Sequence, residues 1–252
     1  MSAAIEGVPA IELRHVTKRF GSRNVLDDLS LAIPAKHGLC LLGRSGTGKS
    51  VTLKHIVGLI TPDAGEVLVE GEDIGRMSRR QLSRTRQRIG FLFQNAALFD
   101  SLSVGDNVAF PLRRHTDGSN AEIVARVRTL LEQVGLERNY DTMPADLSGG
   151  MKKRAGLARA MALEPPILLA DEPSAGLDPI TAAEIDALLI DLKRRLGTTL
   201  VVVTHNIPSA RAIGDELVFL DDAKILARGS PDLLDRCEHP MVREFMRSGG
   251  SG

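Results

Sequence analysis

The chain of 252 residues is poor in aromatic side chains, which make up 3% of it, and it contains no tryptophan. A stacking platform for single-stranded nucleic acid is therefore not expected. Its 32 basic and 32 acidic residues give a formal net charge of +0, which disfavours a general nucleic-acid binder. No apolar run approaches the roughly 18 residues of a membrane span. We expect no nucleic-acid partner.

Cysteine and targeting signals are also scarce. The two cysteines, Cys40 and Cys237, lie far apart and form no C-x-x-C pair, which is typical of reduced thiols in the cytoplasm. Residues 1–6 lack the basic region and the apolar core of a signal peptide. We expect the protein to work inside the cell and to reach any membrane through a partner.

Hydrophobic side chains make up 43% of the chain, which is enough for a large core. The apolar residues occur in two patterns. Alternation of polar and apolar residues predicts half-buried strands at 11–16, 29–33 and 66–70. Continuous apolar runs are typical of strands buried on both faces of a parallel sheet, and they occur at 89–93, 167–170 and 200–203. Since helical patterns separate these runs, we predict an α/β fold with a mostly parallel core sheet.

Helical signals dominate the middle of the chain. Apolar residues between 123 and 134 recur at helical spacing, and the stretch from about 95 to 162 has almost no strand pattern. We interpret 95–162 as a helical subdomain inserted into one domain, 1–247. Asp178 followed by Pro179 predicts the start of another helix, with Ile185, Leu188, Leu189, Leu192 and Leu196 on its buried face. A final short helix is predicted at 240–247, and residues 248–252 have the composition of a flexible linker.

A glycine-rich segment that reads G-x-x-x-x-G-K-S follows the apolar run 39–42. A strand that leads through such a loop into a helix is typical of a phosphate-binding site, because residues without a Cβ let backbone N–H groups turn toward an anion. Lys49 then reaches the β- and γ-phosphates, and the Ser50 hydroxyl ligates Mg²⁺. A glycine-rich turn before a core helix is the alternative. The predicted phosphate-binding residues are Gly43, Arg44, Ser45, Gly46, Thr47, Gly48, Lys49, Ser50 and Val51.

Two acids, Asp171 and Glu172, end the apolar run 167–170. Ligands of such sheets bind at the carboxyl ends of the strands. Asp171 is therefore predicted to hold Mg²⁺ through its water shell, and Glu172 to accept a proton from an attacking water. A strand that merely ends in two surface acids is the alternative.

Further motifs follow the order found in one family. The segment 147–151, Leu-Ser-Gly-Gly-Met, resembles the signature motif of ATP-binding-cassette ATPases, and 174–178 resembles their D-loop. Gln94 and His205 stand where that family has its Q-loop glutamine and its switch histidine, and Phe20 where an aromatic ring stacks on adenine. Taken alone, Gln94 or His205 at a strand end is a structural residue, and Phe20 could equally belong to the core.

The resemblance covers residues 11–247 and implies both a fold and a reaction. The implied fold is a P-loop NTPase cassette with a RecA-like core, an antiparallel β subdomain and the helical insertion. The implied reaction is ATP hydrolysis with Mg²⁺, in which Gln94 contacts the metal ion and the attacking water and His205 contacts the γ-phosphate. In the family the signature binds the ATP of a second subunit, so two ATP molecules join a head-to-tail dimer. The residues implied in this contact are Ser148, Gly149, Gly150 and Asp178.

Several segments resemble more closely the ATPase subunits of Mla/Mce-type phospholipid transporters, which support outer-membrane lipid asymmetry. Within them Phe99 and Phe110 lie where transport cassettes receive a helix of the permease, with ordinary core packing as the alternative. The resemblance implies two permease copies, a lipid-binding periplasmic component, a small regulatory subunit, and a place on the cytoplasmic face of the inner membrane. Two rival interpretations remain: the chain is the ATPase subunit of another ABC importer or exporter, or it is a soluble switch that dimerises on ATP. The segments are 97–100, 106–113, 147–151, 176–180 and 242–245.

Overall fold

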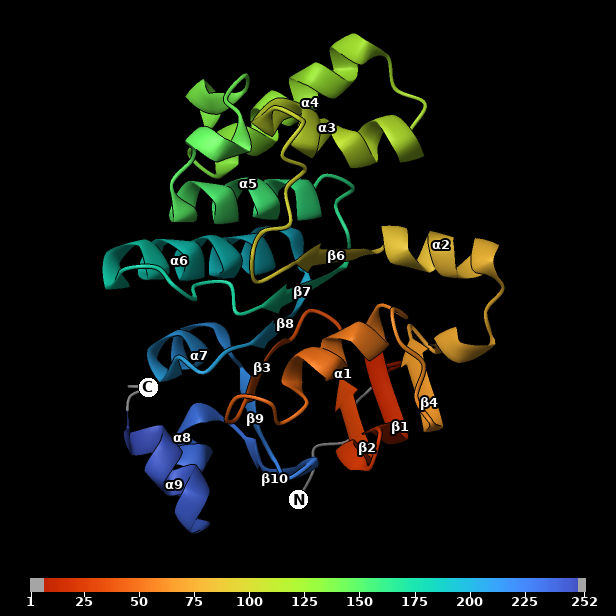
Figure 1. Cartoon of the computed structure of the whole chain (residues 1–252), viewed down its shortest axis with the longest axis vertical. Helices are drawn as coiled ribbons and strands as arrows, with labels where there is room; N and C mark the ends of the chain where they lie inside the picture. Colours follow the sequence, from red (N-terminus) through yellow and green to blue (C-terminus); the bar gives the residue numbers. More distant parts are fainter. Residues whose placement is uncertain (1–6, 249–252) are drawn as a thin grey trace.

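The computed structural model describes residues 7–248, and within that range it has two β-sheets with helices packed on them (Figure 1). Within that range the first sheet has the strand order β2-β1-β4-β5, and every neighbouring pair is antiparallel. This sheet is the antiparallel β subdomain predicted from the sequence. Its strands are β1 (Ile11–Phe20), β2 (Arg23–Ile33), β4 (Ala64–Val69) and β5 (Glu72–Asp73).

The second sheet is the mostly parallel core, with the strand order β10-β9-β3-β8-β7-β6. Its pairs are parallel except for β10, which runs antiparallel to β9. Strands β9 and β10 were not predicted from the sequence. The other four strands begin and end within one residue of the apolar runs 39–42, 89–93, 167–170 and 200–203. The strands are β3 (Gly38–Leu42), β6 (Ile89–Leu92), β7 (Ile167–Asp171), β8 (Thr199–Val203), β9 (Glu216–Asp221) and β10 (Lys224–Gly229).

The core strands are apolar throughout because each face of the sheet is covered. Along β3, Leu39 and Leu41 pack into one hydrophobic cluster, whereas Cys40 and Leu42 pack into the cluster on the other face. Side chains of a strand alternate between faces, so burial on both sides requires a continuous apolar run. The burial that the runs predicted is confirmed.

Helices surround this core sheet. The first, α1 (Lys49–Ile56), ends where the chain leaves the helix at Val57 and Gly58 adopts a left-handed φ of 67°. Glycine accepts that conformation without steric cost and ends helices readily. The other helices outside the segment between β6 and β7 are α2 (Arg79–Gln87), α6 (Pro179–Leu196), α7 (Ile207–Ile213), α8 (Pro231–Asp235) and α9 (Pro240–Arg247).

The segment between β6 and β7 forms a helical layer above the core sheet (Figure 1). It has a hydrophobic cluster of its own, in which Val108, Val127, Leu131 and Ala155 are buried. A separate core is what an inserted subdomain needs. Its helices are α3 (Val104–His115), α4 (Asn120–Gln133) and α5 (Gly149–Ala160).

The start of α6 agrees with the prediction. Asp178 is its N-cap, and its carboxylate accepts hydrogen bonds from the backbone N–H groups of Ile180 and Thr181. The predicted buried face is wrong at Leu196, whose side chain is exposed. Leu196 lies in the last turn, directly before the left-handed Gly197 that ends the helix.

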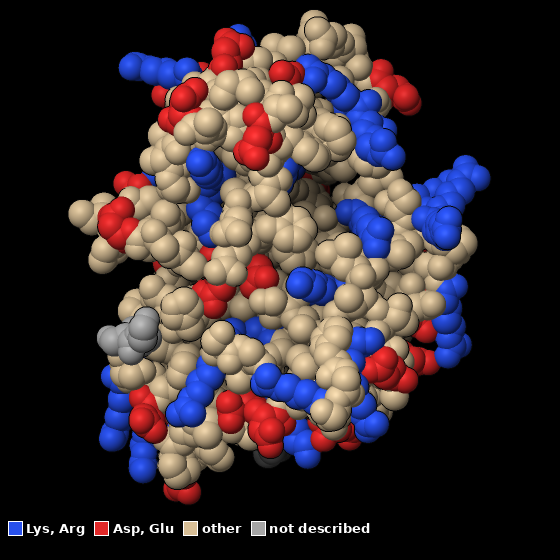
Figure 2. Space-filling view, in the orientation of Figure 1, with Lys and Arg blue, Asp and Glu red and all other residues tan. Residues whose placement is uncertain are grey.

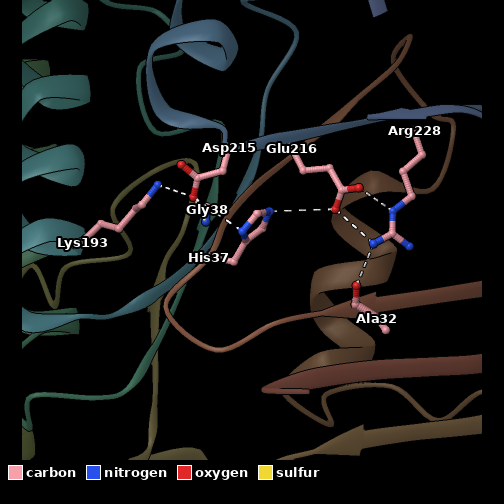
Figure 3. A network of polar contacts seen from close by, with 7 residues as sticks. All are labelled: Ala32, His37, Gly38, Lys193, Asp215, Glu216 and Arg228. Carbon is pink, nitrogen blue, oxygen red and sulfur yellow. Dashed lines mark hydrogen bonds and ion pairs between the residues drawn. The ribbon is translucent and has the colours of Figure 1, made fainter. Parts of the chain in front are cut away.

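A polar network ties the two sheets together where β3 begins (Figure 3). The Asp215 carboxylate accepts from the Gly38 N–H at 2.7 Å and pairs with Lys193 of α6. Arg228 of β10 pairs with Glu216 and donates to the Ala32 carbonyl of β2 at 3.0 Å. The network therefore fixes the end of the core sheet that lies away from the phosphate loop.

One buried acid, Asp186 of α6, should make the stability of the protein depend on pH. Burial raises its pKa, against the lowering effect of the Ser209 hydroxyl, and its Oδ1 atom has no hydrogen-bond partner. An acid whose pKa is raised on folding contributes less stability as pH rises from its unfolded pKa through its folded pKa. We expect Asp186→Asn to raise the melting temperature at pH 8 by a few degrees, about 2–4 °C per kcal/mol, with little gain near pH 3.8, the ordinary pKa of an aspartate carboxyl.

The control is Asp191→Asn, which removes an exposed acid of the same helix that pairs with Arg195. Thermal unfolding of both variants from pH 4 to pH 8 would measure the effect. A gain for Asp186→Asn that is equal at all these pH values would contradict the buried-charge explanation.

No helix within residues 7–248 is both long enough and apolar enough to cross a bilayer. The predicted flexible tail falls almost wholly outside the described residues, which end at Ser248. The limits proposed for the domain, 1–247, and for its helical insertion, 95–162, stay predictions.

Candidate functional site

The glycine-rich loop joins β3 to α1 and is shaped by its glycines. Gly43, Gly46 and Gly48 have φ values of 145°, 78° and 101°, which side chains rarely tolerate. A Cβ at Gly43 would lie 2.1 Å from the Leu220 carbonyl oxygen, and one at Gly48 would lie 2.5 Å from that of Val25. Only glycine fits these positions, and the resulting curl directs backbone N–H groups inward at the start of α1.

Lys49 is held inside that curl. Its buried ammonium donates to the carbonyl oxygens of Gly43 at 2.7 Å and Arg44 at 2.8 Å. Burial lowers its pKa, while the charges of Glu172 and Asp171 act in the opposite direction. A cation with this placement is suited to an anion that enters the loop.

Ser50 and Asp171 bring oxygen atoms of two elements together. The Ser50 hydroxyl of α1 donates to Oδ1 of Asp171, at the end of β7, over 2.8 Å. Burial raises the pKa of Asp171, and the hydrogen bond from Ser50 opposes this. A hydroxyl and a carboxylate beside a phosphate loop fit Mg²⁺, which binds one or two protein oxygens and completes its shell with water and phosphate.

Glu172 and His205 meet at the ends of neighbouring strands. Oε1 of Glu172 lies 2.9 Å from Nδ1 of His205, which follows β8, and the Glu172 N–H donates to the Val203 carbonyl at 2.8 Å. Glu172 has a φ of 47°, a left-handed conformation that is unfavourable for a residue with a Cβ. Backbone strain of this kind collects at functional sites, where the surrounding bonds enforce it.

One cavity of about 840 Å³ is lined by the phosphate loop together with Lys49, Ser50, Glu172 and His205. Its size falls in the range of small-molecule sites. The structure therefore brings the phosphate loop together with the three predicted catalytic residues, Gln94, Glu172 and His205.

Seven of the predicted phosphate-, ligand- and metal-binding residues do not line this cavity. Phe20 is 52% exposed, so the alternative that it belongs to the core is wrong, and the ammonium of Lys18 lies 5.6 Å from its ring centroid. Ser148 caps α5 by accepting from the Met151 N–H at 3.3 Å. Asp171 stays beside the cavity, because it accepts a hydrogen bond from Ser50, which lines it. The residues outside the lining are Phe20, Thr47, Ser148, Gly149, Gly150, Asp171 and Asp178.

One wall of the cavity was not predicted from the sequence. Met241, Glu244 and Phe245 of α9 line it, as does Val25 of β2. Phe245 also packs edge-on against Phe219 of β9, with ring centroids 5.0 Å apart. The apolar side of α9 was visible in the sequence, but no local signal says against which surface a helix packs.

A second hollow, of about 470 Å³, lies between α2, α3 and α5. Phe99 and Phe110 line it with 44% and 41% of their surfaces exposed and their centroids 4.9 Å apart, so ordinary core packing is wrong for both rings. Arg86, Arg114 and Arg159 add positive charge. Figure 2 shows basic side chains gathered on the side of the molecule where α2 and the end of α3 lie.

A phosphate loop, acids at the end of a parallel strand and a helical insertion define a nucleotide-hydrolysing cassette. The family model described as "ABC transporter" matches residues 26–175, and the chain belongs to this family. It is an ATPase cassette that binds ATP.

Named relatives match nearly the whole chain. The "Intermembrane phospholipid transport system ATP-binding protein MlaF" of Escherichia coli K12 is 43% identical over 236 residues, which cover 94% of this chain and 88% of MlaF. The "Probable ribonucleotide transport ATP-binding protein mkl" of Mycobacterium leprae is 43% identical over 237 residues, which cover 94% of this chain and 68% of that protein.

Solved structures agree with the fold. A dimeric structure of the ATP-binding cassette MJ0796, in a post-hydrolysis state bound to ADP and Pi, has a TM-score of 0.82 and 35% identity, and covers 87% of this chain and 98% of that one. The cbiO1 protein from Clostridium perfringens, part of the transporter complex cbiONQ, also has a TM-score of 0.82, with 28% identity and 94% coverage of both chains. The predicted P-loop cassette fold is confirmed.

Proposed function

We propose that this ATPase drives phospholipid transport of the Mla/Mce type, which supports the lipid asymmetry of an outer membrane. The observation that carries the proposal is the 43% identity with MlaF over 88% of its length. The equally similar mycobacterial relative is named for ribonucleotide transport, so a different cargo is the second candidate. In either system the ATP chemistry is the same, and only the identity of the bound cargo separates them.

In the proposed reaction this chain's residues hold the triphosphate and activate water. The loop 43–48 and Lys49 bind the phosphates, and Glu172 accepts the proton of the attacking water, with His205 beside it to orient the γ-phosphate. The oxygens of Ser50 and of its hydrogen-bond partner Asp171 would hold Mg²⁺, together with Gln94, which lines the same cavity as Ser50. When bound, this ion neutralises charge on the β- and γ-phosphate oxygens.

A second copy of the chain completes the site in this proposal. Ser148, Gly149, Gly150 and Asp178 lie outside the cavity of their own chain and so are free to face that of a partner. The start of α5 presents unpaired N–H groups and the positive end of its dipole, which suits an ATP phosphate. Dimeric structures of MJ0796, one of them bound to ADP and Pi, support a head-to-tail pair closed by ATP.

The hollow around Phe99 and Phe110 is the proposed docking site for a helix of the membrane permease. Two exposed rings provide apolar contact area, and the surrounding arginines suit a helix that carries acidic residues. Two permease copies, a lipid-binding periplasmic component and a small regulatory subunit complete the proposed assembly. The ATPase would then sit peripherally on the cytoplasmic face of the inner membrane.

Replacing both rings, Phe99→Ala with Phe110→Ala, is expected to reduce permease capture from native membranes at least about tenfold. Aromatic anchors of an interface typically contribute one to several kcal/mol, and about 1.4 kcal/mol is a tenfold change. Quantitative immunoblotting or mass spectrometry of the captured permease measures the loss, with thermal unfolding as a check of folding.

The matched control is Leu233→Ala, which removes an exposed apolar side chain from α8, outside the hollow. It should capture as much permease as the unaltered chain. Equal capture by the double phenylalanine variant would show that the permease docks elsewhere.

A further inference from the structure

A buried lysine of α5, Lys153, joins two segments of the catalytic cavity. The residue is 5% exposed, and its Nζ atom donates to the main-chain oxygen of Gln94 at 2.5 Å and to that of Glu172 at 2.9 Å. Both acceptors are backbone carbonyls. The ammonium therefore fixes the backbone positions of Gln94 and Glu172 without occupying either functional side chain.

Burying this ammonium is unfavourable unless its surroundings compensate. Burial lowers the pKa of Lys153, while the charges of Glu172 and Asp171 raise it. A buried charge costs free energy even when hydrogen bonds satisfy part of its demand. An apolar residue would fill this buried position of α5 without the cost of burying a charge. The lysine therefore indicates a role at the catalytic site.

The backbone that Lys153 holds is strained. Glu172 has a φ of 47°, and both of its backbone polar groups are bonded: its N–H donates to the Val203 carbonyl and its C=O accepts from Lys153. Non-glycine residues keep such a conformation only where the surroundings enforce it. Loss of the Lys153 bond would let the peptide relax and carry the Glu172 carboxylate away from His205.

A second side chain of α5 holds the same loop further along. Arg159 donates to the carbonyl oxygens of Ala96 and Ala97, each at 2.8 Å, and both alanines have left-handed φ values, 57° and 49°. Its guanidinium also lies 5.6 Å from the ring centroid of Phe99. The loop after β6 is thus bound to α5 at Gln94 and again at 96–97.

We propose that Lys153 is a positioning residue for ATP hydrolysis, which ties Gln94 and Glu172 to α5 so that the helical layer sets the position of the catalytic carboxylate. The proposal rests on the proposed role of Glu172. A displacement of α5, whose Arg159 lines the hollow at Phe99, would reach Gln94 and Glu172 through the Lys153 ammonium. Precise placement of a catalytic group is worth orders of magnitude in rate, so its loss should appear in kcat.

The test compares three variants. Lys153→Met keeps the side-chain length and removes the donors, and we expect kcat for ATP to fall at least about tenfold with KM within about twofold. Lys153→Arg restores donors and should recover most of kcat. Lys193→Met removes a half-buried lysine that pairs with the exposed Asp215 at the far end of the sheet (Figure 3), and it should leave kcat unchanged.

Melting temperatures of all three variants separate a loss of stability from a loss of rate. A kcat for Lys153→Met within twofold of the unaltered chain overturns the proposal, as does an equal loss of kcat in Lys193→Met. Glu172→Gln is measured in parallel. If that variant keeps full turnover, the proposed role of Glu172 fails; if it loses turnover while Lys153→Met does not, only the positioning role fails.

Discussion

Replacing Glu172 with glutamine is expected to reduce ATP turnover at least about 100-fold while ATP still binds. An amide has the shape of the carboxylate but cannot accept a proton, and a general base typically contributes a factor of about 10²–10⁴. The loss of one negative charge beside the triphosphate also favours the bound state. We therefore expect an ATP-bound dimer to accumulate.

Phosphate release measures turnover, calorimetry measures ATP affinity, and size-exclusion chromatography with light scattering measures the dimer. The control is Glu132→Gln, which changes an exposed glutamate of α4 and should leave all three unchanged. Turnover by Glu172→Gln at the rate of the unaltered chain would exclude Glu172 as the base.

Lys49→Ala is expected to abolish measurable ATP binding, with the dissociation constant raised at least about 100-fold. The Lys49 ammonium lies inside the loop, within 2.8 Å of two of its carbonyl oxygens, where phosphate oxygens would accept its hydrogen bonds. Charge-assisted bonds of this kind are worth about 1.5–3 kcal/mol each, and about 1.4 kcal/mol is a tenfold change in affinity.

Lys54→Ala is the matched control, because Lys54 belongs to the same helix but is exposed. It should bind ATP nearly as tightly as the unaltered chain. ATP binding by Lys49→Ala with unchanged affinity would mean that the phosphates bind away from the loop.

Local chemistry made much of the fold and the cavity predictable. The phosphate loop could be predicted because only glycine permits the φ values at Gly43 and Gly48. The core strands could be predicted because burial on both faces requires continuous apolar residues. The N-cap role of Asp178 could be predicted because its carboxylate accepts hydrogen bonds from the first N–H groups of α6.

Features that depend on docking between distant segments escaped prediction. The contact between Phe245 of α9 and Phe219 of β9 places α9 at the cavity of the phosphate loop, which lies almost 200 positions earlier in the chain. No periodicity encodes that contact. Lys153 stands beside Lys152 in a basic run that reads as a solvated helix face, yet only Lys153 is buried. Leu196 fits the apolar stripe of α6 and is exposed because the helix ends there.

Affinity capture from native membranes tests the central claim most directly. The bait is the Glu172→Gln chain with ATP, which should stay in its closed, partner-bound form, and the captured proteins and lipids are identified by mass spectrometry. We predict a permease, a lipid-binding periplasmic protein and enriched phospholipid. A permease without enriched phospholipid would keep the transport ATPase and contradict the lipid cargo, and capture of no membrane protein would contradict the transporter account altogether.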